Sequence, residues 1–214
     1  LVGRMLSVSE YGTFTALVSI MVLIGAPLTT LLMIVSRKVS AYRSNLYESD
    51  RTNLFYIINL KILLFLVLIV LILIIYLENV QNFLLIESST QLYLLIIMMF
   101  VAFPQSVNNA YLQGLQYFKW LSLTGVLGTL LKIIISFILI SAGFGVSGAM
   151  GGIIISSLIM LILIYVILRP SLKGKISGYQ GGAHFSIKSA IPVLLANVAF
   201  VVMTQIDMVL VKHY

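Results

Sequence analysis

The chain has 214 residues, of which 61% are hydrophobic and only 9% carry a formal charge. Soluble domains carry about 25% charged residues, so the composition excludes a soluble globular protein and indicates an integral membrane protein. The chain contains no cysteine, which excludes disulfide bonds, thiolate metal ligands and thiol nucleophiles within it, and its net charge of +7 fits either nucleic-acid binding or a basic membrane face.

Six apolar stretches are long enough to cross a bilayer, because about 20 helical residues at 1.5 Å per residue span its hydrocarbon core. They predict an all-α polytopic membrane protein. The first stretch is expected to begin after an N-cap at Ser9 and to kink at Pro27, and Pro104 is expected to break the third. In chain order the stretches cover residues 11–35, 54–77, 92–112, 120–140, 148–168 and 187–211.

The segments between these spans are polar. Residues 36–53 are predicted to form a helical extension along the membrane surface, and residues 78–91 a polar turn. Residues 141–147 form a Gly-rich turn, whereas residues 169–186 form a basic, Gly-rich linker.

The charges are distributed unevenly between the two sides of the membrane that six spans define. Only Arg4 and Lys212 fall on one side, together with the acids Glu10, Glu78 and Glu87. Cytoplasmic loops are enriched in Lys and Arg, so the segments 36–53, 113–119 and 169–186 are predicted to be cytoplasmic. The positive charge is thereby explained without nucleic acid. The basic residues on that side are Arg37, Lys38, Arg43, Arg51, Lys119, Arg169, Lys173, Lys175 and Lys188.

The fourth span contains a single charge, Lys132, past its middle. A lysine at such depth costs about 2.5 kcal/mol or more on insertion scales, so it is expected to face protein or a wet cavity instead of lipid. The alternative is that the helix begins earlier, at Tyr117, and that the ammonium reaches a backbone carbonyl or interfacial water.

Three segments carry a resemblance to a known family. Residues 7–14, SVSEYGTF, resemble the E-x-Y-G-x-F turn of bacterial oligosaccharide (polysaccharide) flippases. Residues 113–152, which begin QGLQYF, resemble the fourth-to-sixth helix region of that family, with its QG-x-x-x-F turn. Residues 192–214 are similar to the helix that opens its second lobe.

The resemblance implies the multidrug and oligosaccharidyl-lipid exporter fold, with about 12 to 14 helices in two lobes around a central cavity. This chain is then expected to be a fragment of six helices from a longer protein. Residues 1–168 correspond to the N-terminal lobe without its first helix, 169–186 to a cytoplasmic linker and 187–214 to the first helix of the second lobe. The implied activity is flipping polyprenyl-pyrophosphate-linked oligosaccharides to the outer leaflet of the bacterial or archaeal cytoplasmic membrane.

A cavity for such a substrate needs a cation for the pyrophosphate and amides for the sugars, because unpaired buried polar groups are costly. Lys132 is the best candidate for the cation, since lysine serves as a point charge for phosphate. Asn108 and Asn109 follow Pro104, and they either line the cavity or make interhelical hydrogen bonds. Lys61 is a further candidate, although it lies early in its span and is expected to extend to the cytoplasmic surface.

The last span contributes two more candidates, Asn197 and Asp207. Asp207 is expected to pair with a cavity cation, to take part in Na⁺ or H⁺ coupling, or to sit at the interface. At 100° per residue the two side chains point about 80° apart, so they fit one broad face but not one narrow stripe.

Other motifs indicate structure. Gly148 and Gly152 predict a close helix approach, and Tyr117, Phe118 and Trp120 an aromatic belt. His184 and His213 have no metal-site spacing, and the chain has no phosphate loop, zinc motif or nucleophile elbow.

Neither an enzyme nor a cofactor is therefore predicted. The expected partners are the lipid-linked substrate, membrane lipids and polysaccharide polymerase or ligase machinery. The alternative functions are a cation-coupled multidrug exporter of the same superfamily and a membrane glycosyltransferase, ligase or polymerase. The exporter is expected to carry acids deep in its N-terminal lobe, and the enzymes a large loop rich in carboxylates or arginines.

Overall fold

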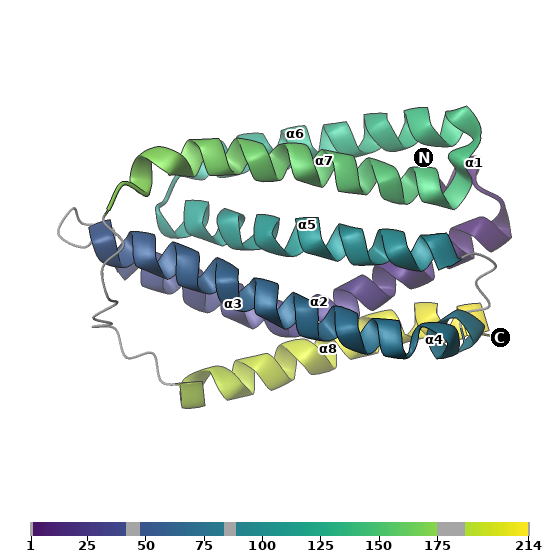
Figure 1. Ribbon diagram of the computed structural model, residues 1–214, viewed down its shortest axis with the longest axis horizontal. Coiled ribbons are helices and arrows are strands. Elements are labelled where there is room, and N and C mark those ends of the chain that lie inside the picture. Colours follow the sequence, from purple (N-terminus) through teal and green to yellow (C-terminus); the bar gives the residue numbers. More distant parts are fainter. Residues whose placement is uncertain (1, 42–47, 84–88, 175–186, 214) are drawn as a thin grey trace.

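The computed structural model describes residues 2–41, 48–83, 89–174 and 187–213, and within these ranges every regular element is a helix (Figure 1). Six long helices run lengthwise, and short helical segments accompany them. The short segments are α1 (Val2–Met5), α4 (Leu77–Phe83), the π-helical turn η2 (Ile140–Phe144) and the 3₁₀ turn η3 (Arg169–Ser171). The long helices are α2 (Val8–Ala41), α3 (Glu48–Ile75), α5 (Ser89–Gly114), α6 (Phe118–Leu139), α7 (Gly145–Leu168) and α8 (Ile187–His213).

Each of the six predicted spans corresponds to one long helix, although the second extends two residues beyond the end of α3 and the fourth one residue beyond the end of α6. Val8–Ala41, Ser49–Ile75, Ser89–Gly114 and Phe118–Ser171 are all long and apolar enough to cross a membrane. The last of these is 54 residues long and folds back on itself, so it contains both α6 and α7. In α8 the apolar stretch Ile191–Asp207 is shorter. The prediction of an all-α, multi-pass membrane protein is confirmed.

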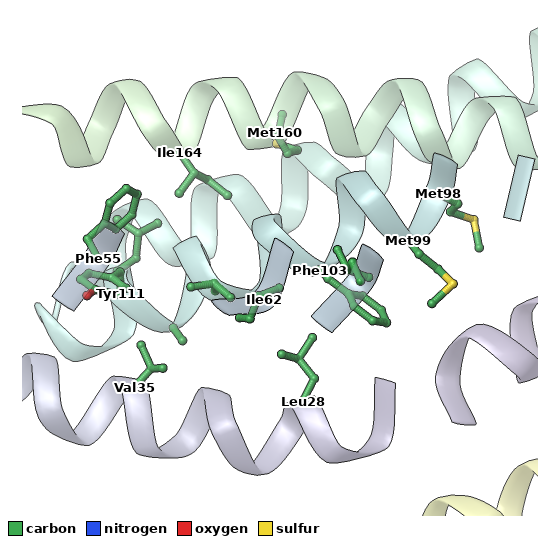
Figure 2. Close-up of a cluster of buried hydrophobic side chains, with 14 of the residues drawn as sticks. Leu28, Val35, Phe55, Ile62, Met98, Met99, Phe103, Tyr111, Met160 and Ile164 are labelled. Atoms are coloured by element: carbon green, nitrogen blue, oxygen red, sulfur yellow. The ribbon is translucent and has the colours of Figure 1, made fainter. Parts of the chain in front are cut away.

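Helix α5 lies at the centre of the packing. It contacts α2 on one side and α7 on the other, and α3 packs on it more lightly. Helix α6 packs along α7, and α8 packs along α2. The buried residues of α5, including Met99, Phe103 and Tyr111, meet side chains from three helices (Figure 2). These partners are Leu28 and Val35 from α2, Phe55 and Ile62 from α3, and Met160 and Ile164 from α7.

The α6–α7 hairpin depends on small residues. A Cβ atom at Gly152 would collide with Ser136 of α6, and one at Gly148 would lie 3.0 Å from the Leu139 carbonyl carbon. The Ser136 hydroxyl donates to the Ala149 carbonyl across the same contact, at 3.3 Å. The close approach predicted from Gly148 and Gly152 is therefore confirmed. The chain reverses through Gly143 and Gly145, whose φ angles are 89° and 47°.

Helix α2 begins earlier than the sequence indicated, because Ser7 is its N-cap. The Ser7 hydroxyl and backbone N–H both donate to the Glu10 carboxylate at 2.9 Å, and the Glu10 N–H donates back to the hydroxyl. This reciprocal pattern is a capping box. The expectation that Ser9 is the cap was wrong, since Ser9 lies inside the first turn. The Glu10 carboxylate also lies where a Cβ of Gly145 would be, next to the α6–α7 turn.

The prediction for residues 36–53 is corrected at the basic end of the bundle. At this end α2, α5 and α7 end, and α3 and α6 begin. Residues 36–41 continue α2 and residues 48–53 begin α3, so the described parts of the predicted surface extension belong to two spans, and residues 42–47 lie outside the described residues. The first turns of α3 are buried at Arg51, Thr52 and Asn53. Arg51 Nε donates to the Ser171 carbonyl at 3.1 Å, and the hydroxyls of Tyr117 and Ser171 are 3.0 Å apart. Hydrogen bonds thus hold α3, the α5–α6 turn and the end of α7 together.

Smaller differences concern the ends and continuity of helices. Helix α5 continues through Pro104 and α2 through Pro27, so Pro104 does not break its span. Helix α6 begins at Phe118, two residues before the predicted start. The predicted turn 78–91 overlaps α4 and the first three residues of α5. The expectations for Arg43, Glu87, His184 and residues 175–186 of the linker lie outside the described residues.

Candidate functional site

A polar hollow of about 140 Å³ lies between α5, α6 and α7, and Lys132 is the charged residue in its lining. We call it the Lys132 hollow. Its wall contains two amides, four hydroxyls and two glycines, and only two side chains are apolar. The lining residues other than Lys132 are Gln105, Asn109, Thr124, Gly125, Gly128, Thr129, Ser156, Ser157, Met160 and Ile164.

Helical periodicity explains how the sequence builds this hollow. Thr124, Gly128 and Lys132 are four residues apart, so they form one stripe along α6, and Gln105 and Asn109 have the same spacing on α5. Helix α7 packs against both α5 and α6, which meet each other much less. The two stripes therefore border one hollow, and α7 forms its remaining wall. The glycines and the short hydroxyl side chains in this lining are too small to fill the space between the helices.

Most hydroxyls of the hollow already have a hydrogen-bond partner for their proton. Thr124 donates to the Trp120 carbonyl at 2.8 Å, Thr129 to the Gly125 carbonyl at 2.9 Å, and Ser156 to the Ile153 carbonyl at 3.0 Å. A hydroxyl that donates its proton to a backbone carbonyl three or four residues earlier in its own helix still has oxygen lone pairs that can accept hydrogen bonds. The hydroxyls consequently offer acceptors to a hydroxyl-rich ligand such as a sugar.

Lys132 differs from its neighbours because it is a cation without a counter-ion in the part of the chain that the structure describes. Its side chain is exposed to the hollow, and no described carboxylate or backbone carbonyl pairs with its ammonium group. It lies about 21 Å along α6 from Phe118, well inside the span. An unpaired cation at this depth is suited to binding an anionic group.

The other predicted site residues lie apart from the Lys132 hollow, except Asn109. Asn108 is 3% exposed, and its Oδ1 has no hydrogen-bond partner among the described residues. Asn197 Nδ2 donates to Thr30 Oγ1 at 3.1 Å and so joins α8 to α2. Lys61 is exposed on α3, and Asp207 is exposed on α8.

Sequence reasoning missed Gln105 and the hydroxyl residues as members of the site. The signal that identifies them is the four-residue spacing of Gln105 with Asn109 and of Thr124 with Lys132. Ser156 and Ser157 have no such signal, because only the packing of α7 shows which way they face. In the described residues, no group of three His, Asp or Glu side chains has the arrangement of a metal site.

A family model described as "polysaccharide biosynthesis protein" matches residues 1–214, the whole chain. The chain belongs to this family. As a member, it is a multi-pass membrane protein connected with polysaccharide biosynthesis, which confirms the resemblance at that level. No curated protein and no solved structure matches the chain.

Proposed function

We propose that this family member flips polyprenyl-pyrophosphate-linked oligosaccharides from the cytoplasmic to the outer leaflet by alternating access. The observation that carries the proposal is Lys132, an unpaired cation deep in a span that lines a hollow of amides and hydroxyls. A pyrophosphate needs a positive partner when it leaves water, and sugar hydroxyls need hydrogen-bonding groups. The family match connects this chemistry with polysaccharide synthesis.

The size of the hollow limits what it holds. A volume of about 140 Å³ accommodates a few water-sized groups, so it suits a phosphate group or part of one sugar. The rest of an oligosaccharide would lie outside it, in the space between two lobes. We assign residues up to 168 to the first lobe, 169–186 to a linker and α8 to the second lobe. Asp207 on α8 is the candidate for Na⁺ or H⁺ coupling.

The proposal makes the protein a transporter and not an enzyme. No covalent bond of the substrate changes in the step, so the chain needs only to bind the headgroup and to exchange access between the two leaflets. Rocking of one lobe against the other about a midplane site is the usual way in which such proteins exchange access.

Export of surface polysaccharide in cells that lack their own flippase tests this function. The full-length protein carrying Lys132→Ala is expected to lose export, whereas Lys132→Arg retains part of it because the charge is kept. Lys61→Ala is the matched control, since Lys61 is an exposed lysine on a span outside the hollow. Full export by a well-expressed Lys132→Ala variant would contradict the proposal, as would drug efflux without any polysaccharide export.

A further inference from the structure

A second hollow, of about 410 Å³, lies between α2 and the end of α5, and its lining includes Arg37. We call it the Arg37 hollow. It lies near the basic end of the bundle, the end that the charge distribution assigns to the cytoplasm. Four of its six lining residues are polar, namely Thr29, Ser36, Arg37 and Gln113, and the other two are Leu32 and Met33.

The position of this hollow is fixed by a close crossing of α2 and α5. A Cβ atom at Gly114 would lie 2.7 Å from both the Ser36 carbonyl oxygen and the Val39 Cβ. Only a glycine therefore permits this approach. Gln113, the residue before Gly114, is thereby held beside Ser36 and Arg37.

Amide side chains of α5 line both hollows. Gln105 and Asn109 line the Lys132 hollow, and Gln113 lines the Arg37 hollow. The three amides are four residues apart, so they follow one another along the same side of α5 with a rise of about 6 Å per step.

The two hollows differ in chemistry. The planar guanidinium of Arg37 suits bidentate binding of phosphate, and none of the described carboxylates pairs with it. Leu32 and Met33 are two of the six residues that line the Arg37 hollow, whereas apolar side chains are two of the eleven that line the Lys132 hollow. The Arg37 hollow is therefore suited to an amphiphile that presents a phosphate and the first part of a hydrocarbon chain.

We propose that the Arg37 hollow is a capture site for the phosphate end of a polyprenyl pyrophosphate in the cytoplasmic leaflet. Gln113, Asn109 and Gln105 then form the path along which the headgroup reaches Lys132. This inference rests on the proposed flippase function, and it adds an initial binding step at a separate site.

Binding to the purified full-length protein in nanodiscs tests the capture site. The probe is a long-chain polyprenyl pyrophosphate without sugar, and inorganic pyrophosphate and phosphatidylglycerol are the comparison ligands. Arg37→Ala is expected to weaken probe binding about tenfold, because one charge-assisted contact is lost. Lys38→Ala is the matched control, since Lys38 is the next basic residue on α2 but does not line the hollow. Inorganic pyrophosphate is expected to bind much more weakly, since it cannot use the apolar side chains of the lining.

Transport in proteoliposomes separates capture from passage. Arg37→Ala is expected to raise the substrate concentration for half-maximal flipping with little change in maximal rate, whereas Lys132→Ala lowers the maximal rate. Arg37→Lys, which keeps the charge, is expected to restore part of the affinity and shows that loss is not due to misfolding. Unchanged probe binding by Arg37→Ala would overturn the capture site, and so would equal competition by phosphatidylglycerol. If Lys132→Ala still abolished flipping in either case, the proposed function would stand; normal flipping by both variants would overturn both proposals.

Discussion

Helices α3 and α7 are both long and strongly apolar, yet they are packed very differently. Along α7 the buried positions include Gly148, Gly152, Ser156 and Ser157, and both α5 and α6 pack against it. Helix α3 is rich in Leu, Ile and Val, and most side chains of its second half, residues 61–75, are exposed. Lipid tails are as apolar as leucine, so apolarity alone does not bring helices together in a membrane. Small residues bring helices together because they let the two backbones approach closely.

The two helices are also fixed at different places. Helix α7 is attached to its neighbours by small residues along about half of its length. Helix α3 is attached by the polar residues of its first turns and by a seam, a narrow row of buried side chains in its second half. Leu66 and Ile62 belong to that seam, since both are buried while their neighbours face outwards. Substitutions on the two helices should consequently differ in their effects.

The largest effect is expected on α7, from Gly152→Ala. The added methyl group would overlap Ser136 and push α6 away, at a cost of about 3 kcal/mol in the free energy of unfolding. Thermal unfolding of the full-length protein in detergent measures this loss of stability. Gly125→Ala on α6 is the control, because a Cβ there meets nothing within 4 Å. Equal stability of the two variants would show that the α6–α7 contact is looser than described.

An intermediate effect is expected on the seam of α3. Leu66 is 0% exposed and Leu68 is 57% exposed, although both lie on one helix two residues apart. Leu66→Ala is expected to cost about 2 kcal/mol because it leaves a cavity, and Leu68→Ala close to nothing because lipid fills the space. The same unfolding assay compares them. A larger loss from Leu68→Ala would mean that this face of α3 is covered by protein.

The smallest effect is expected at the basic end of α3. Arg51 is 7% exposed and donates to the Ser171 carbonyl, so Arg51→Ala removes one charged hydrogen bond. The expected cost is about 1.5 kcal/mol, together with faster proteolysis after Ser171. Lys61→Ala, on the exposed face of the same helix, serves as the control. Identical protease sensitivity of the two variants would remove Arg51 from the attachment of this segment.

Sequence reasoning predicted the helices well because each depends on local composition. An apolar run of sufficient length has few alternatives in a membrane, and the Gly148 and Gly152 pair indicated its own close contact. The burial of Arg51, Thr52 and Asn53 was missed because their polarity suggests a surface, and the partner of Arg51, the Ser171 carbonyl, lies 120 residues away in the sequence.

The candidate site could be predicted only in part for the same reason. The depth of Lys132 in its span is a local property, and it singled out this residue. Whether Asn108 or Asn109 joins it depends on how α5 is rotated, and the structure turns Asn109 to the hollow and buries Asn108. Ser157 joins the site only because α7 packs against both α5 and α6.

The most direct test of the account is water access to position 132 in the membrane. Lys132→Cys and Leu68→Cys are compared in a full-length protein without other cysteines, by reaction with a charged, membrane-impermeant thiol reagent. We predict that Cys at position 132 reacts and that a polyprenyl-pyrophosphate-linked oligosaccharide protects it, whereas Cys at position 68 stays unreactive in lipid. Reaction at both positions, or no protection at position 132, would contradict the assignment of the Lys132 hollow as the substrate site.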